Sequence, residues 1–403
     1  MREVATVGIL GAGTMGAGIA QVAAEAGLDA LLVDPVEGAT ARAHERIAGF
    51  VRRKVEKGQL TADEARVAIG RVMPVAGVDG LAAADLIIEA IPEDLDLKRD
   101  AFRRLDALAA SDAILATNTS SLSVARIAAA TRHPERVVGM HFFNPVPLMA
   151  LVEVIPGPMT APEVADTAAL VARRMGKTSV VAADTPGFIV NRVQRALYLE
   201  GFRIFEEGLA DVAAIDDAMR QVGFRLGPFE LADVVGTDVN LAAGTAIFEG
   251  FSGDPRYRPA MVQRRIVDAG RLGRKASAGY YDYLADGARG AAWSALDRQR
   301  DGGPRIPSIE PAQIEARVLA AIVNEAASAV SDGVAPPEAI DTAMRLAANW
   351  PEGPLAWGER IGLSSIVHTL DALHAVVPDG RYRVTPLLRL IAERGGSFLP
   401  ADA

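Results

Sequence analysis

The stretch that decides the fold is ATVGILGAGTMG, residues 5–16. A short apolar run, Ala5–Leu10, is typical of a buried strand and leads directly into the pattern G-x-G-x-x-G. The first glycine of that pattern allows a tight turn, the second lets the backbone approach a pyrophosphate, and the third lets helix and strand pack closely. We therefore predict a dinucleotide-binding turn that opens a helix over Ala17–Ala26, built from Gly11, Gly13, Thr14, Met15 and Gly16.

An acidic residue follows the next apolar run. Asp34 comes directly after Leu31-Leu32-Val33, eighteen residues beyond Gly16. A carboxylate at this place accepts the adenosine ribose hydroxyls of NAD and repels the 2′-phosphate of NADP. The alternative is a purely structural glycine-rich turn. The full order of strand, glycines, helix, strand and Asp favours an NAD site.

The first part of the chain, to about residue 182, alternates short apolar runs with amphipathic segments. Such alternation predicts an α/β fold, a Rossmann-type doubly wound sheet of parallel strands with right-handed crossovers. The charged segment 35–70 is longer than an ordinary crossover helix, and we expect a protruding helical hairpin there. The predicted strands are Ala5–Leu10, Ala30–Val33, Leu86–Ala90, Ala113–Ala116, Val137–Met140, Leu151–Ile155 and Ser179–Val181.

From Pro186 onward the pattern is that of helices alone, and it contains an internal repeat. Residues 125 apart are identical at Arg192/Arg317, Glu200/Glu325 and Asp216/Asp341, among others. We therefore expect two tandem all-α domains after the sheet domain. The predicted division is 1–182 for the NAD-binding domain, 183–285 for the first helical domain, 286–311 for a linker and 312–403 for a second, degenerate helical domain.

Composition excludes several classes of partner. The formal net charge is −9 and no basic stripe is present, so nucleic acid is not expected as a partner. The sequence contains no cysteine, which excludes disulfides and thiol chemistry, and it shows no metal-ligand cluster, so no metal is expected. No signal-peptide pattern and no apolar run long enough to span a bilayer is seen, so we expect a cytoplasmic protein without a membrane partner.

A histidine and a carboxylate follow one another across a Pro-containing turn in HFFNPVPLMALVEVI, residues 141–155. His141 ends an apolar run, and Glu153 lies inside another. A carboxylate buried in a strand needs a charged or donor partner, and a His oriented by a carboxylate is a base that works near neutral pH. The alternatives are a core histidine for His141 and an exposed position on an edge strand for Glu153.

Further polar residues follow predicted strands, at the edge where open α/β sheets bind ligands. Glu93 and Lys98 come after the strand Leu86–Ala90, and they are either part of this site or a solvated helix start. Ser120 lies in the run after Ala113–Ala116. Hydroxyls there either donate to a substrate oxygen or cap the next helix, a cap that Ser121 or Ser123 can also provide.

Asn191 stands in the segment that joins the sheet domain to the helices. It either caps a helix or hydrogen-bonds a substrate. The matching residue in the second copy is Ala316, so the asparagine is not required merely to build the helix.

Taken together, these motifs resemble the L-3-hydroxyacyl-CoA dehydrogenase family over nearly the whole chain. The resemblance rests on GAGTMGAGIA, NTSSLSV, HFFNPVPLMALVEVI, DTPGFIVNR, GPFELADVVG and RLGRKASAGYYDY. The two helical copies, with GPLAWGERIG and GRYRVTPLLR, are similar to bacterial members that act on short-chain substrates, such as 3-hydroxybutyryl-CoA and 3-hydroxyadipyl-CoA dehydrogenases.

The resemblance implies a role for each matching residue. The catalytic histidine is His141 with its paired carboxylate Glu153, and the ligands of the substrate oxygen are Ser120 and Asn191. The coenzyme A contact is Lys57, whereas the family's serine in that region corresponds to Phe50 here. The implied NAD contacts are Gly11, Gly13, Thr14, Met15, Gly16, Asp34, Glu93, Lys98, Asn144 and, near the nicotinamide, Lys275.

The resemblance implies NAD-dependent oxidation of an L-3-hydroxyacyl-CoA, with a short-chain acyl-CoA such as 3-hydroxybutyryl-CoA as the expected substrate. Alternatives are 3-hydroxyadipyl-CoA, a sugar-acid dehydrogenase, or a non-enzymatic NAD-binding structural protein. The second helical copy lacks the asparagine. We expect it to act as a built-in partner of the first, in place of the homodimer that single-copy relatives form, while a homo-oligomer of the whole chain stays open.

Overall fold

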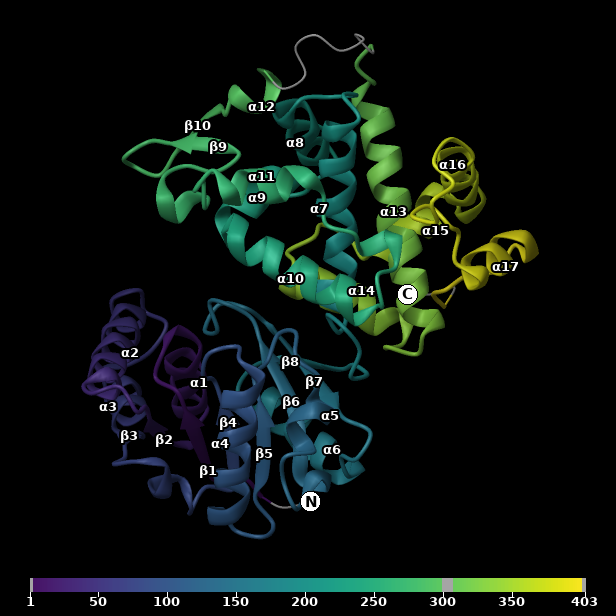
Figure 1. Ribbon diagram of the computed structural model, residues 1–403. Helices are drawn as coiled ribbons and strands as arrows, with labels where there is room; N and C mark the ends of the chain where they lie inside the picture. The colour runs from purple at the N-terminus through teal and green to yellow at the C-terminus, as the bar shows by residue number, and fades with distance from the viewer. Residues whose placement is uncertain (1–2, 299–306, 401–403) are drawn as a thin grey trace. The chain divides into compact units, whose positions relative to one another are not determined.

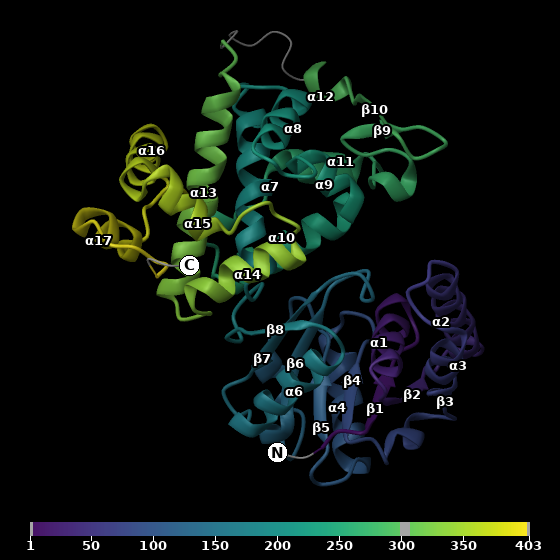
Figure 2. The same ribbon diagram turned by 180° about the vertical axis from the view of Figure 1, so that it is seen from behind.

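The computed structural model describes residues 3–298 and 307–400 (Figure 1). Its chain divides into two compact units, Met1–Phe188 and Ile189–Ala403. The first is an α/β unit, and the second is mainly helical. Figure 2 shows the same two units from behind.

One eight-stranded sheet forms the first unit, in the order β3-β2-β1-β4-β5-β6-β7-β8. The order reverses direction between β1 and β4, as in a doubly wound sheet, and the expected fold class is confirmed. The strands are β1 (Thr6–Leu10), β2 (Asp29–Val33), β3 (Val72–Pro74), β4 (Leu86–Glu89), β5 (Ile114–Thr117), β6 (Val137–Phe142), β7 (Leu151–Pro156) and β8 (Thr178–Val181). The helices are α1 (Thr14–Glu25), α2 (Ala39–Glu56), α3 (Ala62–Gly70), α4 (Leu95–Leu108), α5 (Val124–Ala128) and α6 (Pro162–Arg174).

Two features of the sheet differ from the expectation. β6 and β7 pair antiparallel, whereas the alternation of strands and helices predicted parallel strands throughout. The connection between them, residues 143–150, is too short for the crossover that a parallel pair requires. The edge strand β3 was not predicted, because it has only three residues and two of them are exposed.

The glycine-rich turn joins β1 to α1 as predicted. A β-carbon on Gly16 would lie 1.8 Å from the carbonyl oxygen of Gly11, so only glycine permits this close approach. Gly11 itself has a φ of +110°. The helix therefore begins at Thr14, directly above the end of the first strand, and points its free backbone N–H groups at the carboxyl edge of the sheet.

The predicted helical hairpin is present as α2 and α3, which lie beside α1 in both views (Figures 1 and 2). The long helix α2 buries Ala43, Ile47, Ala48 and Val51 and exposes most of its charged residues. The second helix begins with a capping box, in which Thr61 and Glu64 satisfy each other's backbone N–H groups.

The second unit is built around two long helices, α7 (Val190–Glu206) and α13 (Pro311–Ser331), which pack against each other. The other helices are α8 (Val212–Gln221), α9 (Pro228–Val235), α10 (Thr237–Gly250), α11 (Met261–Asp268), α12 (Ala295–Arg298), α14 (Pro337–Ala347), α15 (Pro354–Ile361), α16 (Leu363–Val376) and α17 (Pro386–Arg394). A small hairpin of β9 (Tyr281–Tyr283) and β10 (Arg289–Ala292) interrupts this helical region, which was expected to contain helices alone.

The internal repeat appears in the structure as reciprocal buried ion pairs between α7 and α13. The Arg192 guanidinium donates to Glu325 at 2.6 Å, and the matching Arg317 donates to Glu200. The hydroxyls of two further repeat-related residues donate to the same carboxylates, Tyr257 to Glu325 at 2.6 Å and Tyr382 to Glu200 at 2.9 Å. The two copies therefore contact each other through equivalent residues.

Both copies also use the same aspartate to begin a helix. Asp216 accepts the backbone N–H groups of Phe229 and Glu230, and Asp341 accepts those of Leu355 and Ala356. The conserved spacing of the repeat thus preserves a helix start as well as an interface.

Within the described residues, no single helix is long and apolar enough to cross a membrane. Among these residues, only α9 and α10 taken together reach that length and composition, and they are bent by 101° where they meet.

Candidate active site

The histidine and the glutamate of residues 141–155 form a buried pair. His141 and Glu153 face each other in the antiparallel register of β6 and β7, and Nδ1 of His141 lies 2.6 Å from Oε2 of Glu153. The glutamate is fully buried and the histidine is 5% exposed. An exposed edge position for Glu153 is therefore wrong, because β8 pairs with the far side of β7.

A carboxylate only accepts hydrogen bonds, so Nδ1 of His141 carries the hydrogen and Nε2 keeps the lone pair. The imidazole also lies against two aromatic rings, with centroid distances of 4.4 Å to Phe143 and 5.9 Å to Phe188. These contacts fix the plane of the ring. The pair is chemically suited to take up a proton at Nε2 while the carboxylate stabilises the resulting charge.

One carboxylate organises the loop that carries Ser120. Oε1 of Glu93 accepts hydrogen bonds from the Thr119 hydroxyl at 2.6 Å and from the backbone N–H groups of Ser120 and Ser121 at 2.9 and 3.1 Å. The hydroxyls of both serines also donate to it, at 3.3 and 3.1 Å. Ser120 lies just after β5, and β5 pairs with β6, the strand that carries His141. The next helix, α5, is capped by Ser123, which was one of the two predicted caps.

A buried lysine holds Glu93 from the other side. Nζ of Lys98 lies 2.6 Å from Glu89 and 3.3 Å from Glu93, and the side chain is 1% exposed, so a solvated helix start is wrong for Lys98. The start of α4 is capped by Asp94 instead. Burial alone would raise the pKa of Glu93, but the Lys98 charge and the hydrogen bonds from Thr119, Ser120 and Ser121 outweigh it, so the pKa lies below its ordinary value.

Glu89 is a residue that the sequence reasoning missed. It ends β4 with no exposed surface and accepts from Lys98, from the Thr117 hydroxyl at 2.7 Å and from the N–H of Ile91 at 2.8 Å. The available signal was an acid at the end of an otherwise apolar strand, nine residues before a lysine. Such an acid needs a buried partner.

The glycine-rich turn borders a cavity of about 270 Å³. Asp34 enters its wall at the end of β2 and accepts the backbone N–H groups of Ala12 at 2.7 Å and Val36 at 2.8 Å. A β-carbon on Gly13 would meet no atom within 4 Å, so space for a ligand is open at this point of the turn. The cavity and its donor set fit the pyrophosphate and adenosine ribose of a dinucleotide.

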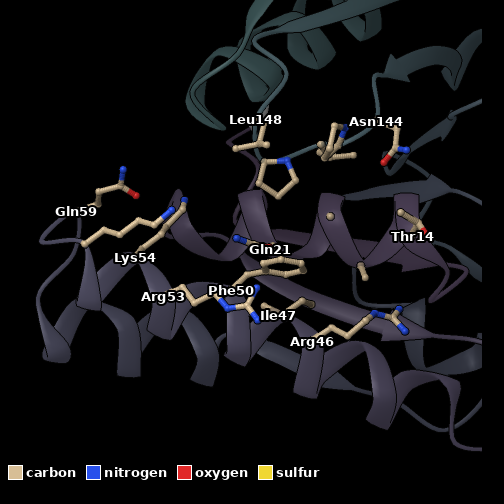
Figure 3. Close-up of a pocket in the computed structure, with 16 residues that line it drawn as sticks. Thr14, Gln21, Arg46, Ile47, Phe50, Arg53, Lys54, Gln59, Asn144 and Leu148 are labelled. Carbon is tan, nitrogen blue, oxygen red and sulfur yellow. The ribbon is translucent and has the colours of Figure 1, made fainter. Parts of the chain in front are cut away.

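A second and larger cavity, of about 490 Å³, lies between α1, α2 and the loop after β6 (Figure 3). Two predicted ligand contacts line it, Lys57 from the end of α2 and Asn144 from the loop. Phe50, the departure from the family pattern, lies on the α2 side of this cavity, where its ring is about half exposed. The lining is mostly apolar, with Arg46, Arg53, Lys54 and Lys57 as its cations.

Two predicted site residues belong to the second unit. Asn191 lies in the first turn of α7, whose N-cap is Ile189, so the capping interpretation of Asn191 is wrong. Nζ of Lys275 lies 2.7 Å from both carboxylate oxygens of Asp238. The sheet unit therefore assembles the remaining predicted residues by itself, along the carboxyl edge and beside α1.

Comparisons with known proteins agree on one family. Residues 6–185 match the NAD-binding domain of 3-hydroxyacyl-CoA dehydrogenase, and residues 187–283 and 314–397 match its C-terminal domain. A 3-hydroxyadipyl-CoA dehydrogenase of Escherichia coli K12 is 37% identical over 96% of this chain and 98% of its own length. A probable 3-hydroxybutyryl-CoA dehydrogenase of Bacillus subtilis is 41% identical over 70% of this chain and 98% of its own length.

Solved structures show the same similarity. A crystal structure of a 3-hydroxybutyryl-CoA dehydrogenase from Escherichia coli K12 superimposes with a TM-score of 0.89 and 36% identity, over 98% of this chain and 99% of that one. The match covers both helical copies, so their arrangement within one chain is shared with that protein.

Proposed function

The chain belongs to the 3-hydroxyacyl-CoA dehydrogenase family, and we propose that it oxidises an L-3-hydroxyacyl-CoA reversibly to the 3-oxoacyl-CoA, with NAD as its cofactor. The observation that carries the proposal is the buried contact of 2.6 Å between His141 and Glu153. It provides an oriented base at the carboxyl edge of a sheet whose first turn is built for a dinucleotide.

In the proposed reaction Nε2 of His141 removes the proton of the 3-hydroxyl group. Bound NAD would supply the acceptor for the hydride that leaves C3. Glu153 keeps the imidazole in the tautomer that accepts this proton and stabilises the imidazolium that forms. The Ser120 hydroxyl and the Asn191 amide hold the substrate oxygen, whose charge changes as the C–O bond becomes a carbonyl.

We assign cofactor binding to the glycine-rich turn, Asp34, Glu93, Lys98, Asn144 and Lys275. The first cavity supports the assignment of the turn and of Asp34, since both border it. Glu93 and Lys98 are supported by their mutual contact, which holds the loop of Ser120 at the same sheet edge.

The second cavity is the proposed site of the coenzyme A moiety. Its cationic rim includes Lys57, and coenzyme A carries several phosphates. A short acyl chain such as 3-hydroxybutyryl is the proposed substrate, because several similar proteins are named for it. The alternative is 3-hydroxyadipyl-CoA, for which one relative that matches both helical copies is named, whereas a solved structure that also matches both copies is named for 3-hydroxybutyryl-CoA.

We further propose the four-part division 1–182, 183–285, 286–311 and 312–403, in which the last part is an internal partner of the second. Reciprocal pairs between Arg192 and Glu325 and between Arg317 and Glu200 support it, because a symmetric dimer would pair equivalent residues in this way. Residues 299–306 of the linker lie outside the described residues. We also propose a cytoplasmic location, as expected for an enzyme that uses NAD and a coenzyme A ester.

The test is a direct assay of purified full-length protein. We expect NADH to form from NAD and L-3-hydroxybutyryl-CoA, and we expect NADP to be a poor substitute. Parallel turnover of 3-hydroxyadipyl-CoA decides between the two acyl groups by the ratio of kcat/KM. Absence of NADH formation with either ester, while NADH still binds, would overturn the proposed activity and favour a structural NAD-binding protein.

A further inference from the structure

The two cavities of the sheet unit share part of their walls. Thr14 and Arg46 line both the cavity at the glycine-rich turn and the larger cavity between α1 and α2. In Figure 3 the labelled side chains of the larger cavity run from Gln59 and Lys54 at one end to Arg46 and Thr14 at the other. A cation therefore stands where the two cavities meet.

Arg46 is held at this position by the turn itself. Its Nη2 donates to the carbonyl oxygen of Ala12 at 3.0 Å. The backbone N–H of Ala12 donates to the Asp34 carboxylate at 2.7 Å. The backbone of Ala12 is thus held from one side by the end of β2 and from the other by α2, and the guanidinium of Arg46 keeps further donors for other acceptors.

The charges around the two cavities favour anionic ligands in both. Among the described residues that line the larger cavity, none is acidic and four are cationic, in a chain with a formal net charge of −9. The smaller cavity has Asp34 as its acid and Arg42 and Arg46 as its cations. Arg42 lines only the smaller cavity, Arg53 lines only the larger one, and Arg46 lines both.

We propose that Arg46 binds both ligands of the reaction, the phosphates of the dinucleotide on one side and the phosphate-bearing end of the coenzyme A ester on the other. This inference rests on the proposed function, since that function supplies the two ligands. A guanidinium suits the role because its planar array of five N–H donors can serve acceptors in different directions. It is a binding residue shared by two sites, and none of the roles carried over from the family includes it.

The experiment compares three matched substitutions, R46M, R42M and R53M, each of which removes one guanidinium from α2. NADH binding is followed by its fluorescence, and binding of free coenzyme A by calorimetry, so neither readout needs turnover. We expect R46M to weaken both ligands roughly five- to twentyfold, R42M to weaken only NADH, and R53M to weaken only coenzyme A. The variant R46K keeps the charge but not the planar array of donors and should recover part of both affinities.

The outcomes separate the two proposals. If wild-type protein binds both ligands and turns over the ester but R46M weakens only one of them, the shared role of Arg46 is wrong and the proposed function stands. If R42M and R53M each weaken both ligands as much as R46M does, loss of any cation from α2 explains the result, which also overturns the inference. If wild-type protein does not bind coenzyme A, the proposed function fails, and the shared role fails with it.

Discussion

At the scale of single residues, the pair of His141 and Glu153 makes the sharpest prediction. His141→Gln removes the base but keeps a polar side chain of similar reach, so kcat should fall about 10³–10⁴-fold while NADH binding stays within a factor of two to three. Glu153→Gln removes the negative charge that stabilises the imidazolium and should lower kcat about a hundredfold or more. Steady-state kinetics and fluorescence titration measure both. Unchanged kcat in His141→Gln would remove the histidine from the mechanism.

This pair also marks how far residues can be placed from sequence. A carboxylate within an apolar strand has to have a partner, and a histidine twelve residues earlier across a Pro-containing turn was an available one, so the contact could be predicted. The hydrogen bonds of Glu93 to Thr119, Ser120 and Ser121 could not, because they depend on how two loops after neighbouring strands approach each other in space.

Phe50 makes a second prediction at this scale. Its half-exposed ring lines the larger cavity, and Arg53 lies over it, 5.7 Å from the ring centroid. An aromatic face can stack on a nucleotide base, an interaction worth about 1–3 kcal/mol. Phe50→Ser should therefore raise the KM for the coenzyme A ester by about 5- to 150-fold and leave the KM for NAD unchanged.

The control for this prediction is Val67→Ser, an equally exposed apolar residue on α3 that does not line the cavity. It should alter neither KM. Equal effects of the two substitutions would mean that loss of surface packing, and not of a ligand contact, explains the result at Phe50.

At the scale of elements, the loop after β5 depends on Glu93, which directly precedes the N-cap residue of α4. Glu93 is the common acceptor of that loop, and its lowered pKa means that it is charged throughout the neutral range. Glu93→Gln removes this charge beside Lys98 and weakens the hydrogen bonds that place Ser120. We expect kcat/KM to fall tenfold or more, since charge-assisted hydrogen bonds are each worth about 1.5–3 kcal/mol.

The neighbouring change Asp94→Asn is the matched control for Glu93. Asp94 caps α4 by accepting the N–H of Leu97, and asparagine caps about equally well. Kinetic constants should therefore stay within a factor of about two. A comparable loss in both variants would show that the start of α4, and not the Glu93 carboxylate, determines activity.

Elements were predictable from sequence where their pattern was long and regular. The hairpin of α2 and α3 was evident from its charged, helical composition, and the tandem helical copies from identities at a constant offset. The antiparallel pairing of β6 and β7 departs from the predicted parallel sheet, because the connection of residues 143–150 is too short for a crossover. The hairpin of β9 and β10 is short and was hidden in a stretch rich in Gly and Asp.

At the scale of the whole molecule, stability at acid pH depends on the ion pairs between the two helical copies. Burial would raise the pKa of Glu200, but the charges of Arg317 and Arg203 outweigh it, so the folded-state pKa lies below the ordinary 4.5. A depressed pKa contributes stability that is present above the unfolded value and is lost as pH falls through the folded value. Glu200→Gln should therefore destabilise the protein by about 3–5 kcal/mol at pH 7.

Because wild type loses this stability when Glu200 is protonated, the difference in free energy of unfolding between wild type and Glu200→Gln should narrow as pH falls below about 4.5. Thermal unfolding followed by circular dichroism between pH 3 and pH 7 measures it. Glu338→Gln, at an exposed position on α14, is the control and should not change the unfolding midpoint. If the two proteins differ in unfolding midpoint by the same amount at every pH in this range, protonation of Glu200 is not coupled to folding.

The built-in partner can be tested by removing the second copy. Without the residues after Pro311, Arg192 loses Glu325 and Asp332, and Glu200 loses Arg317 and keeps Arg203 alone. A buried charge that has lost its partner costs several kcal/mol. In a dimer of the truncated chain, Glu200 of one protomer would take the place that Glu325 holds beside Arg192. We therefore expect residues 1–311 to aggregate or to form a dimer, measured by light scattering during gel filtration.

Charge reversal makes this prediction specific. In the truncated chain, R192E alone should abolish any dimer by placing two carboxylates together, and R192E with E200R should restore it by exchanging the signs. The control is Glu338→Gln in the full-length protein, an exposed position away from these ion pairs, and it should leave the oligomeric state unchanged. A well-behaved, fully active monomer of residues 1–311 would contradict the built-in partner, because the first copy would then need no second copy to cover α7.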